Sequence, residues 1–490
     1  MENLIKIVKK LSKKEFTNLL EEVSGGKDNH PRYVLEYIRV SKFDEEVLIQ
    51  KLEIDHGAYY TMKSRLMNKV AVVLANKNTY AIKEKVANVG SSIFNEDKKI
   101  TIKYLKDLEK QLISFDLSNE LIVVYKALAR HHIYDPDEYD KYEKLYNKHV
   151  AHSLAMEKAE DLLLKFIRDV GEYRLTGDPV DKEMIHRQRR EMYNITEMFP
   201  SHRLFVLNNI INIYYHCMFD TVEELKTKEK EVDETLREFE DIFNKYDLDA
   251  FYHNRKPLID FMYVLYYYRI GEISHGNVYY KSVVSAMPYI VGKHAFTFYI
   301  IMLLKAKLEK YFIDENVREL IDLNPILNKN FEIDKLEIYH QVAYGLFRAN
   351  TAIIVGNYQG AEQIIKGMKS KLPLRLYING DVECKAMLCL LYSLLGDEEK
   401  CKKNMASLSR RLDLDKPEYE NISLFLKFLK VISKHGDLDR RLRISQEIFG
   451  DFVRSNVGPH QILRYIKITE EMTHQIANHG SNKSSHPTKK

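Results

Sequence analysis

Apolar residues recur at helical spacing from the first residues of the chain. Leu4, Ile5, Val8 and Leu11 repeat with the period of an amphipathic helix, and four more short helical patterns follow before residue 80. Asp44 stands directly before one of them and is the expected N-cap of a helix over 45–52, because its carboxylate can accept from the free amides of the first turn. We therefore predict a small N-terminal helical domain over residues 1–80.

From about residue 100 onward, long helical patterns alternate with short breaks, and pairs of helices recur at a period of about 40 residues. The stretch after Thr221 is long and highly charged. It carries one apolar stripe, which predicts that this helix docks on the protein and turns its charges to solvent. The stripe consists of Leu225, Val232, Leu236, Phe239 and Phe243.

Three segments share a register: 257–288, 342–373 and 382–413. Each has a glycine at the break between its two predicted helices, a small residue five positions later and a large apolar residue four positions beyond that. The three sets are Gly271, Gly276 and Tyr280; Gly356, Ala361 and Ile365; Gly396, Cys401 and Met405. Seventeen residues after the break stand Pro288 and Pro373, whereas the third segment has Asp413. Small residues allow close helix approach, and the bulky residues fill the adjacent space.

This register resembles the tetratricopeptide repeat (TPR), which favours an aromatic residue at the eleventh position and a small one at the eighth. Tyr267 and Tyr392 match the former, and Ala349 and Cys389 the latter; the departures are Val264 and Ala352. The resemblance implies an all-α protein: a right-handed α-solenoid of TPR-like helical hairpins over residues 81–478, preceded by the N-terminal domain. It fits a bacterial family of such proteins. Residues 479–490 lack an apolar period and predict a disordered tail.

Composition sets limits on partners and compartment. The chain has 75 basic and 71 acidic residues and a formal charge of +4, which gives no global signal for nucleic acid or membrane binding. Four cysteines are too few for a disulfide framework. The chain has no apolar stretch approaching the ~18 residues that a membrane span needs. We expect a cytoplasmic protein without a membrane partner.

The usual catalytic and cofactor motifs are missing. The sequence contains neither GxxxxGK[ST] nor GxGxxG, HExxH or GxSxG, so we expect no cofactor and no metal. His131, His132 and His186 are interpreted as surface or packing histidines, and Cys389 and Cys401 as small residues of one helix pair. An enzyme with scattered site residues remains an alternative. The leading expectation is a non-catalytic scaffold.

In tetratricopeptide arrays the first helix of each pair lines a concave face that binds peptides or partner helices. The matching positions here include Tyr268, Arg269 and Asn350. Arg269 and Asn350 would hold a peptide carboxylate or backbone, and Tyr268 would supply an aromatic anchor. The competing interpretation is that Tyr268 only packs and Arg269 is an ordinary solvated charge. The predicted partner is a protein or peptide.

A rival site lies in the N-terminal domain. Residues 43–74 have the outline of a helix-turn-helix, and the sequence has no acidic residue between His56 and Lys77. Lys63, Arg65 and Lys69 would then contact nucleic acid, and the protein would be a peptide-responsive transcription regulator. The alternative is a helical cap whose basic face is merely solvated.

Overall fold

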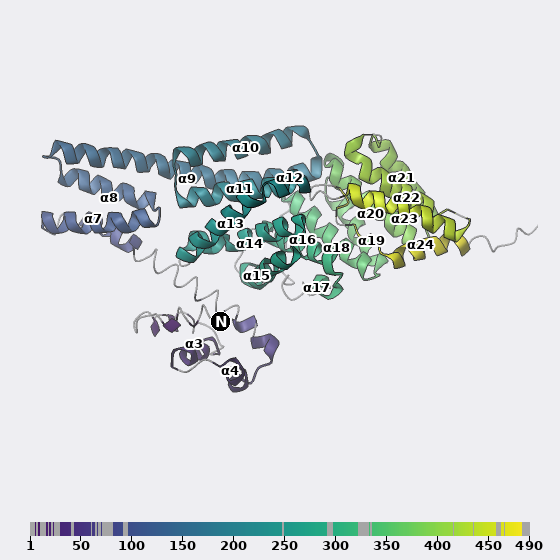
Figure 1. The fold of residues 1–490 in the computed structure, drawn as a ribbon, viewed down its shortest axis with the longest axis horizontal. Helices are drawn as coiled ribbons and strands as arrows, with labels where there is room; N and C mark the ends of the chain where they lie inside the picture. The colour runs from purple at the N-terminus through teal and green to yellow at the C-terminus, as the bar shows by residue number, and fades with distance from the viewer. Residues whose placement is uncertain are drawn as a thin grey trace, which may run out of the picture.

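The computed structural model describes a chain built from helices joined by short turns and connections. The described residues are 30–40, 44–59, 61–63, 82–91, 97–246, 249–291, 297–321, 336–414, 416–434, 436–456, 462–464 and 466–482, with residue 333 and isolated positions between 5 and 70. Those ranges contain no β-strand, which confirms the all-α prediction. Figure 1 shows an elongated body with α7 and α8 at one end and α22–α24 at the other.

Helices of the N-terminal half, in chain order, are α3 (His30–Val40), α4 (Glu45–Leu52), α7 (Lys98–Ser114), α8 (Ser118–His131), α9 (Pro136–Thr176), α10 (Pro179–Met198), α11 (His202–Phe219), α12 (Val222–Thr227) and α13 (Glu229–Lys245). Those of the C-terminal half are α14 (Ala250–Ile270), α15 (Ile273–Val291), α16 (Thr297–Asp314), α17 (Val317–Ile321), α18 (Ile338–Ile354), α19 (Tyr358–Lys371), α20 (Ile378–Leu394), α21 (Glu398–Arg411), α22 (Glu420–Ile432), α23 (Leu438–Ser455) and α24 (Glu470–Asn482). Short 3₁₀ turns, η1 (Leu374–Leu376) and η2 (Pro417–Tyr419), precede α20 and α22.

The three aligned segments form helical hairpins: α14 with α15, α18 with α19, and α20 with α21. Their break glycines all adopt the left-handed conformation, with φ of 94° at Gly271, 77° at Gly356 and 70° at Gly396. Glycine suits this conformation because it has no Cβ to clash. A Cβ on Gly276 would clash with the Tyr268 ring, so only glycine fits there without a shift of that ring. The bulky positions of the alignment, Tyr280, Ile365 and Met405, are buried as predicted.

Two prolines of the first segment do not mark helix ends. Helix α14 begins at Ala250, where the Asp249 carboxylate caps the Phe251 amide at 2.9 Å, and it runs through Pro257. Helix α15 continues past Pro288 to Val291. A proline inside a helix removes one hydrogen bond. In α14, burial of the neighbouring side chain of Leu258 helps to offset that loss.

The charged stretch after Thr221 docks as expected. All five residues of its predicted stripe are buried. The stretch is divided at Lys228 into α12 and α13, and a capping box joins Thr221 to Glu224 at its start. A 6-residue helix and a 17-residue helix therefore replace the single long helix that the sequence suggests.

At the N-terminus, Asp44 caps α4 as predicted, and its Oδ1 accepts from the amides of Glu46 at 3.1 Å and Val47 at 3.2 Å. The described apolar residues from Val8 to Val70 form a cluster of their own. At the other end of the chain, α24 extends to Asn482. Residues 479–482 are thus helical, contrary to the predicted tail, and 483–490 lie outside the described residues.

Helix α9 is 41 residues long, which corresponds to roughly 60 Å. Its Tyr142 belongs to an apolar cluster shared with α7 and α8. Its middle, represented by Leu163 and Phe166, joins the large cluster built around α11 and α14. Its last turn places Leu175 in the cluster of α18–α24. One helix therefore contributes to three cores.

Candidate functional site

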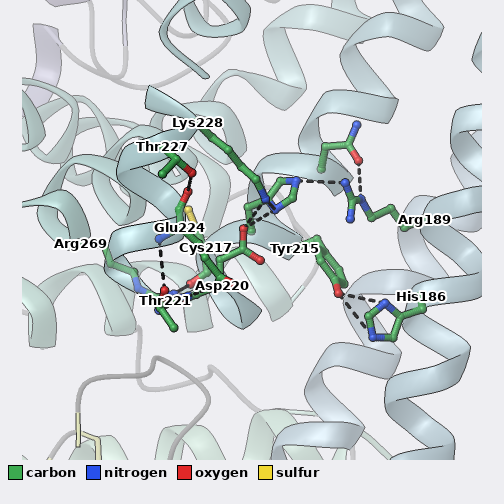
Figure 2. A network of polar contacts seen from close by, with 12 residues as sticks. His186, Arg189, Tyr215, Cys217, Asp220, Thr221, Glu224, Thr227, Lys228 and Arg269 are labelled. Carbon is green, nitrogen blue, oxygen red and sulfur yellow. Dashed lines mark hydrogen bonds and ion pairs between the residues drawn. The ribbon is translucent and has the colours of Figure 1, made fainter. Parts of the chain in front are cut away.

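Arg269 and Tyr268 lie in separate packing contacts. The Arg269 guanidinium donates to the backbone carbonyls of Cys217 and Asp220, where α11 ends (Figure 2). These carbonyls lack partners within their own helix, so the arginine satisfies them. Burial lowers the pKa of Arg269. Its two terminal nitrogens are therefore used inside the protein, and it is not the solvated charge of the competing interpretation.

Tyr268 is half-buried, and its hydroxyl donates to Asn277 Oδ1 at 2.8 Å. Its ring covers Gly276 on the partner helix of the same hairpin. Burial raises the pKa of Tyr268. The packing interpretation accounts for these contacts, and nothing in them requires a peptide.

A polar network surrounds the end of α11 (Figure 2). His216 Nδ1 lies 2.7 Å from Asp220 Oδ2, which also accepts from Lys228 at 2.7 Å. His216 Nε2 lies 3.0 Å from Arg189 Nη2, and its Nδ1 also lies 3.0 Å from Lys228 Nζ. Burial is the largest cause of the lowered pKa of His216. Because both ring nitrogens have partners, the network fixes the helix end rather than offering a free base.

A small, partly open chamber lies where the large cluster meets the cluster of α18–α24. It has a volume of about 60 Å³, enough for a few water molecules or the end of an apolar side chain. Its walls come from α9, α16, α18 and α20, with Ile466 closing one side. Most of its lining is apolar; the polar exceptions are Arg174, Lys305, Tyr339, Asn350 and Glu383.

A buried ion pair forms one wall of the chamber. Arg174 Nη2 donates to Glu383 Oε1 at 3.1 Å and to Oε2 at 3.0 Å, and the two side chains are 10% and 5% exposed. Arg174 Nη1 is buried, and among the described residues it has no hydrogen-bond partner. An unpaired buried donor costs free energy. This nitrogen therefore keeps an unused donor beside the ion pair.

Asn350 lies on the chamber wall, together with Leu346 of the same helix. Both lie on the first helix of the second hairpin, and Glu383, which also lines the chamber, lies on the first helix of the third. The structure thus brings Asn350 into a cavity, while Tyr268 and Arg269 line none of the chamber. Sequence reasoning missed Arg174, which lies 209 residues from Glu383. A basic residue at the end of α9 gives no local signal of such a partner.

In the N-terminal domain, Lys63 Nζ lies 2.8 Å from Glu45 Oε1, and its side chain is 17% exposed. Glu46 of α4 lies 3.8 Å from His56. Glu45 and Glu46 of α4 therefore lie beside Lys63 and His56, and Glu45 offsets part of the positive charge of Lys63. Arg65 and Lys69 lie outside the described residues.

The described part of the chain offers no cluster of His, Cys, Asp and Glu that could hold a metal ion. Within it, no helix is both long and apolar enough to span a membrane. Cys401 Sγ lies 3.2 Å from Ser393 Oγ and 3.5 Å from the Cys389 carbonyl, and burial raises the pKa of both thiols. The two cysteines are reduced packing residues, as predicted.

Comparison of the chain with family models, curated proteins and solved structures gives no match. Its function must therefore be argued from the chamber and the surfaces around it.

Proposed function

We propose that this protein is a non-catalytic scaffold that binds a partner protein or peptide through a right-handed α-solenoid of TPR-like hairpins. The supporting observation is the chamber. It is lined by α18 and α20, the first helices of two successive hairpins, which are the helices that carry partners in tetratricopeptide arrays.

The chamber suits one apolar side chain of an extended segment. Its apolar lining would contact that side chain, and Arg174 Nη1 would bond a carbonyl or carboxylate of the segment. Asn350 lies on the same wall. An apolar lining with a few convergent polar groups is usual for a binding site, and the volume of about 60 Å³ limits the occupant to the end of one side chain.

The test is selection of a phage-displayed random peptide library on the immobilised full-length protein. Ala343 lines the chamber and is half-buried, so Ala343→Leu would fill the space. Ala406 is exposed on α21, and Ala406→Leu is the matched control. We expect enriched peptides to share an apolar residue, to bind the control normally and to bind Ala343→Leu at least ~10-fold more weakly, which corresponds to ~1.4 kcal/mol. Absence of enrichment, or equal binding to the filled variant, would refute the proposal.

The transcription-regulator alternative stays a hypothesis. The Lys63–Glu45 pair reduces the charge that this part of the surface presents to a phosphate backbone. The enzyme alternative also stays a hypothesis.

A further inference from the structure

A second pocket opens on the opposite side of the first turns of α20. It has a volume of about 560 Å³, within the ~300–1,000 Å³ typical of small-molecule sites. Its floor is the connection 372–376 between α19 and α20. Four cations line it, from α19, this connection, α20 and α21 respectively: Lys369, Arg375, Lys385 and Arg411.

A single carboxylate faces these cations. Asp381 lies 2.8 Å from Lys385 Nζ, 3.2 Å from Arg411 Nη1 and 3.7 Å from Lys369 Nζ. Arg375 is exposed, and its side chain makes no ion pair within the described chain. Four positive charges and one negative charge leave a formal excess of +3 in the pocket.

The cations come from separate segments and are held in place by the fold. Arg411 Nη2 donates to the Arg375 carbonyl at 2.9 Å, which ties the end of α21 to the connection. Arg411 Nε is buried, and in the part of the chain that the structure describes it has no partner. Gathering like charges is unfavourable unless an anion compensates for them. The arrangement is therefore more costly without an anion than with one.

We propose that this basic pocket binds a small soluble anion that carries phosphate groups. A diphosphate bears about three negative charges near neutral pH, which matches the excess of the pocket, whereas one carboxylate would leave two cations uncompensated. Guanidinium groups bind phosphate oxygens in a bidentate geometry, and lysines add point charges. This site is separate from the chamber and does not depend on the scaffold proposal.

The test is isothermal titration calorimetry of the full-length protein with inorganic pyrophosphate and with citrate, at constant ionic strength. We expect one pyrophosphate to bind per chain at sub-millimolar concentration, more tightly than citrate, and more weakly as NaCl is raised. Lys369→Gln/Arg411→Gln should weaken binding by roughly 100-fold, since each charged contact contributes about 10-fold.

The matched control is Lys371→Gln/Arg410→Gln. It removes the same charge from the same two helices at exposed positions outside the pocket. Its affinity should stay within about 3-fold of the wild type, since these exposed side chains do not line the pocket and solvent screens their charge. Arg375→Gln, at an exposed position in the pocket, should cost about 10-fold and serves if the double variant misfolds. Absence of pyrophosphate binding, citrate binding at least as tight, or equal losses in the pocket and control variants would overturn the proposal.

Discussion

The first turns of α20 carry a buried carboxylate on each of two sides, and the two carboxylates differ in the number of cations that pair with them. Glu383 faces the chamber and Asp381 faces the basic pocket, and both side chains are almost fully buried, at 5% and 6% exposed. The difference lies in their cations. Arg174 is 10% exposed and is the single partner of Glu383 in the described chain. Asp381 is shared by three cations: Lys385, which is 13% exposed, and Lys369 and Arg411, which are 29% and 27% exposed.

This difference in pairing predicts different roles for the two carboxylates, one in protein stability and one in anion binding. A buried one-to-one pair must remain complete, because removing one partner leaves an uncompensated charge away from water. A carboxylate with several partly hydrated cations tolerates the loss of one. The chamber side should therefore dominate stability, and the pocket side should dominate anion binding.

The largest effect is expected from Arg174→Met. Loss of the guanidinium leaves Glu383 buried without its ion pair, so the free energy of unfolding should fall by about 3–5 kcal/mol. Urea unfolding followed by circular dichroism measures it. The double variant Arg174→Met/Glu383→Leu should regain most of the loss, because no isolated charge remains. A double variant as unstable as the single one would show that the packing of Arg174, rather than its charge, is what matters.

A smaller effect is expected at the end of α18, which lines the chamber. Gly356 has φ of 77° with open space around its Cα, so Gly356→Ala should cost about 1 kcal/mol through backbone strain alone. Gly367 lies inside α19, also with open space, and Gly367→Ala should stabilise the protein by up to ~1 kcal/mol. The same unfolding experiment compares them. Shifts of the same sign would contradict the assigned role of the turn.

The smallest effect on stability is expected from Lys369→Met. Two other cations still face Asp381, so the free energy of unfolding should change by less than ~0.5 kcal/mol. Thermal melts at low and high NaCl provide the measurement. A loss above ~2 kcal/mol would mean that the pocket cations are structural in the same sense as Arg174, and the contrast between the two sides would disappear.

Local features were predictable from the sequence. The Asp44 cap, the turns at Gly271, Gly356 and Gly396, and the apolar stripe after Thr221 all depend on residues within a turn or two of one another. Their physical determinants are hydrogen-bond capping, steric freedom and helical period, which a single sequence displays.

Features that depend on distant packing were not predictable. Asn350 was a reasonable site residue, but its neighbour Arg174 comes from a helix that ended more than 170 residues earlier. The hydrogen bonds from Arg269 to the carbonyls of Cys217 and Asp220 at the end of α11 likewise cannot be predicted from the spacing of apolar residues. Proline usually interrupts a helix, but α14 remains helical through Pro257, so this local rule does not predict the helix end.

The long reach of α9 also has a consequence for synthesis of the chain. Its last turn is translated 209 residues before Glu383, and at 5–20 residues per second the interval is roughly 10–40 s. Throughout that time Arg174 lacks its ion-pair partner Glu383, so the end of α9 carries an unpaired cation that the finished protein buries. The nascent chain is thus most open to chaperones, or to misassembly between neighbouring copies on one messenger RNA, until α20 has been made.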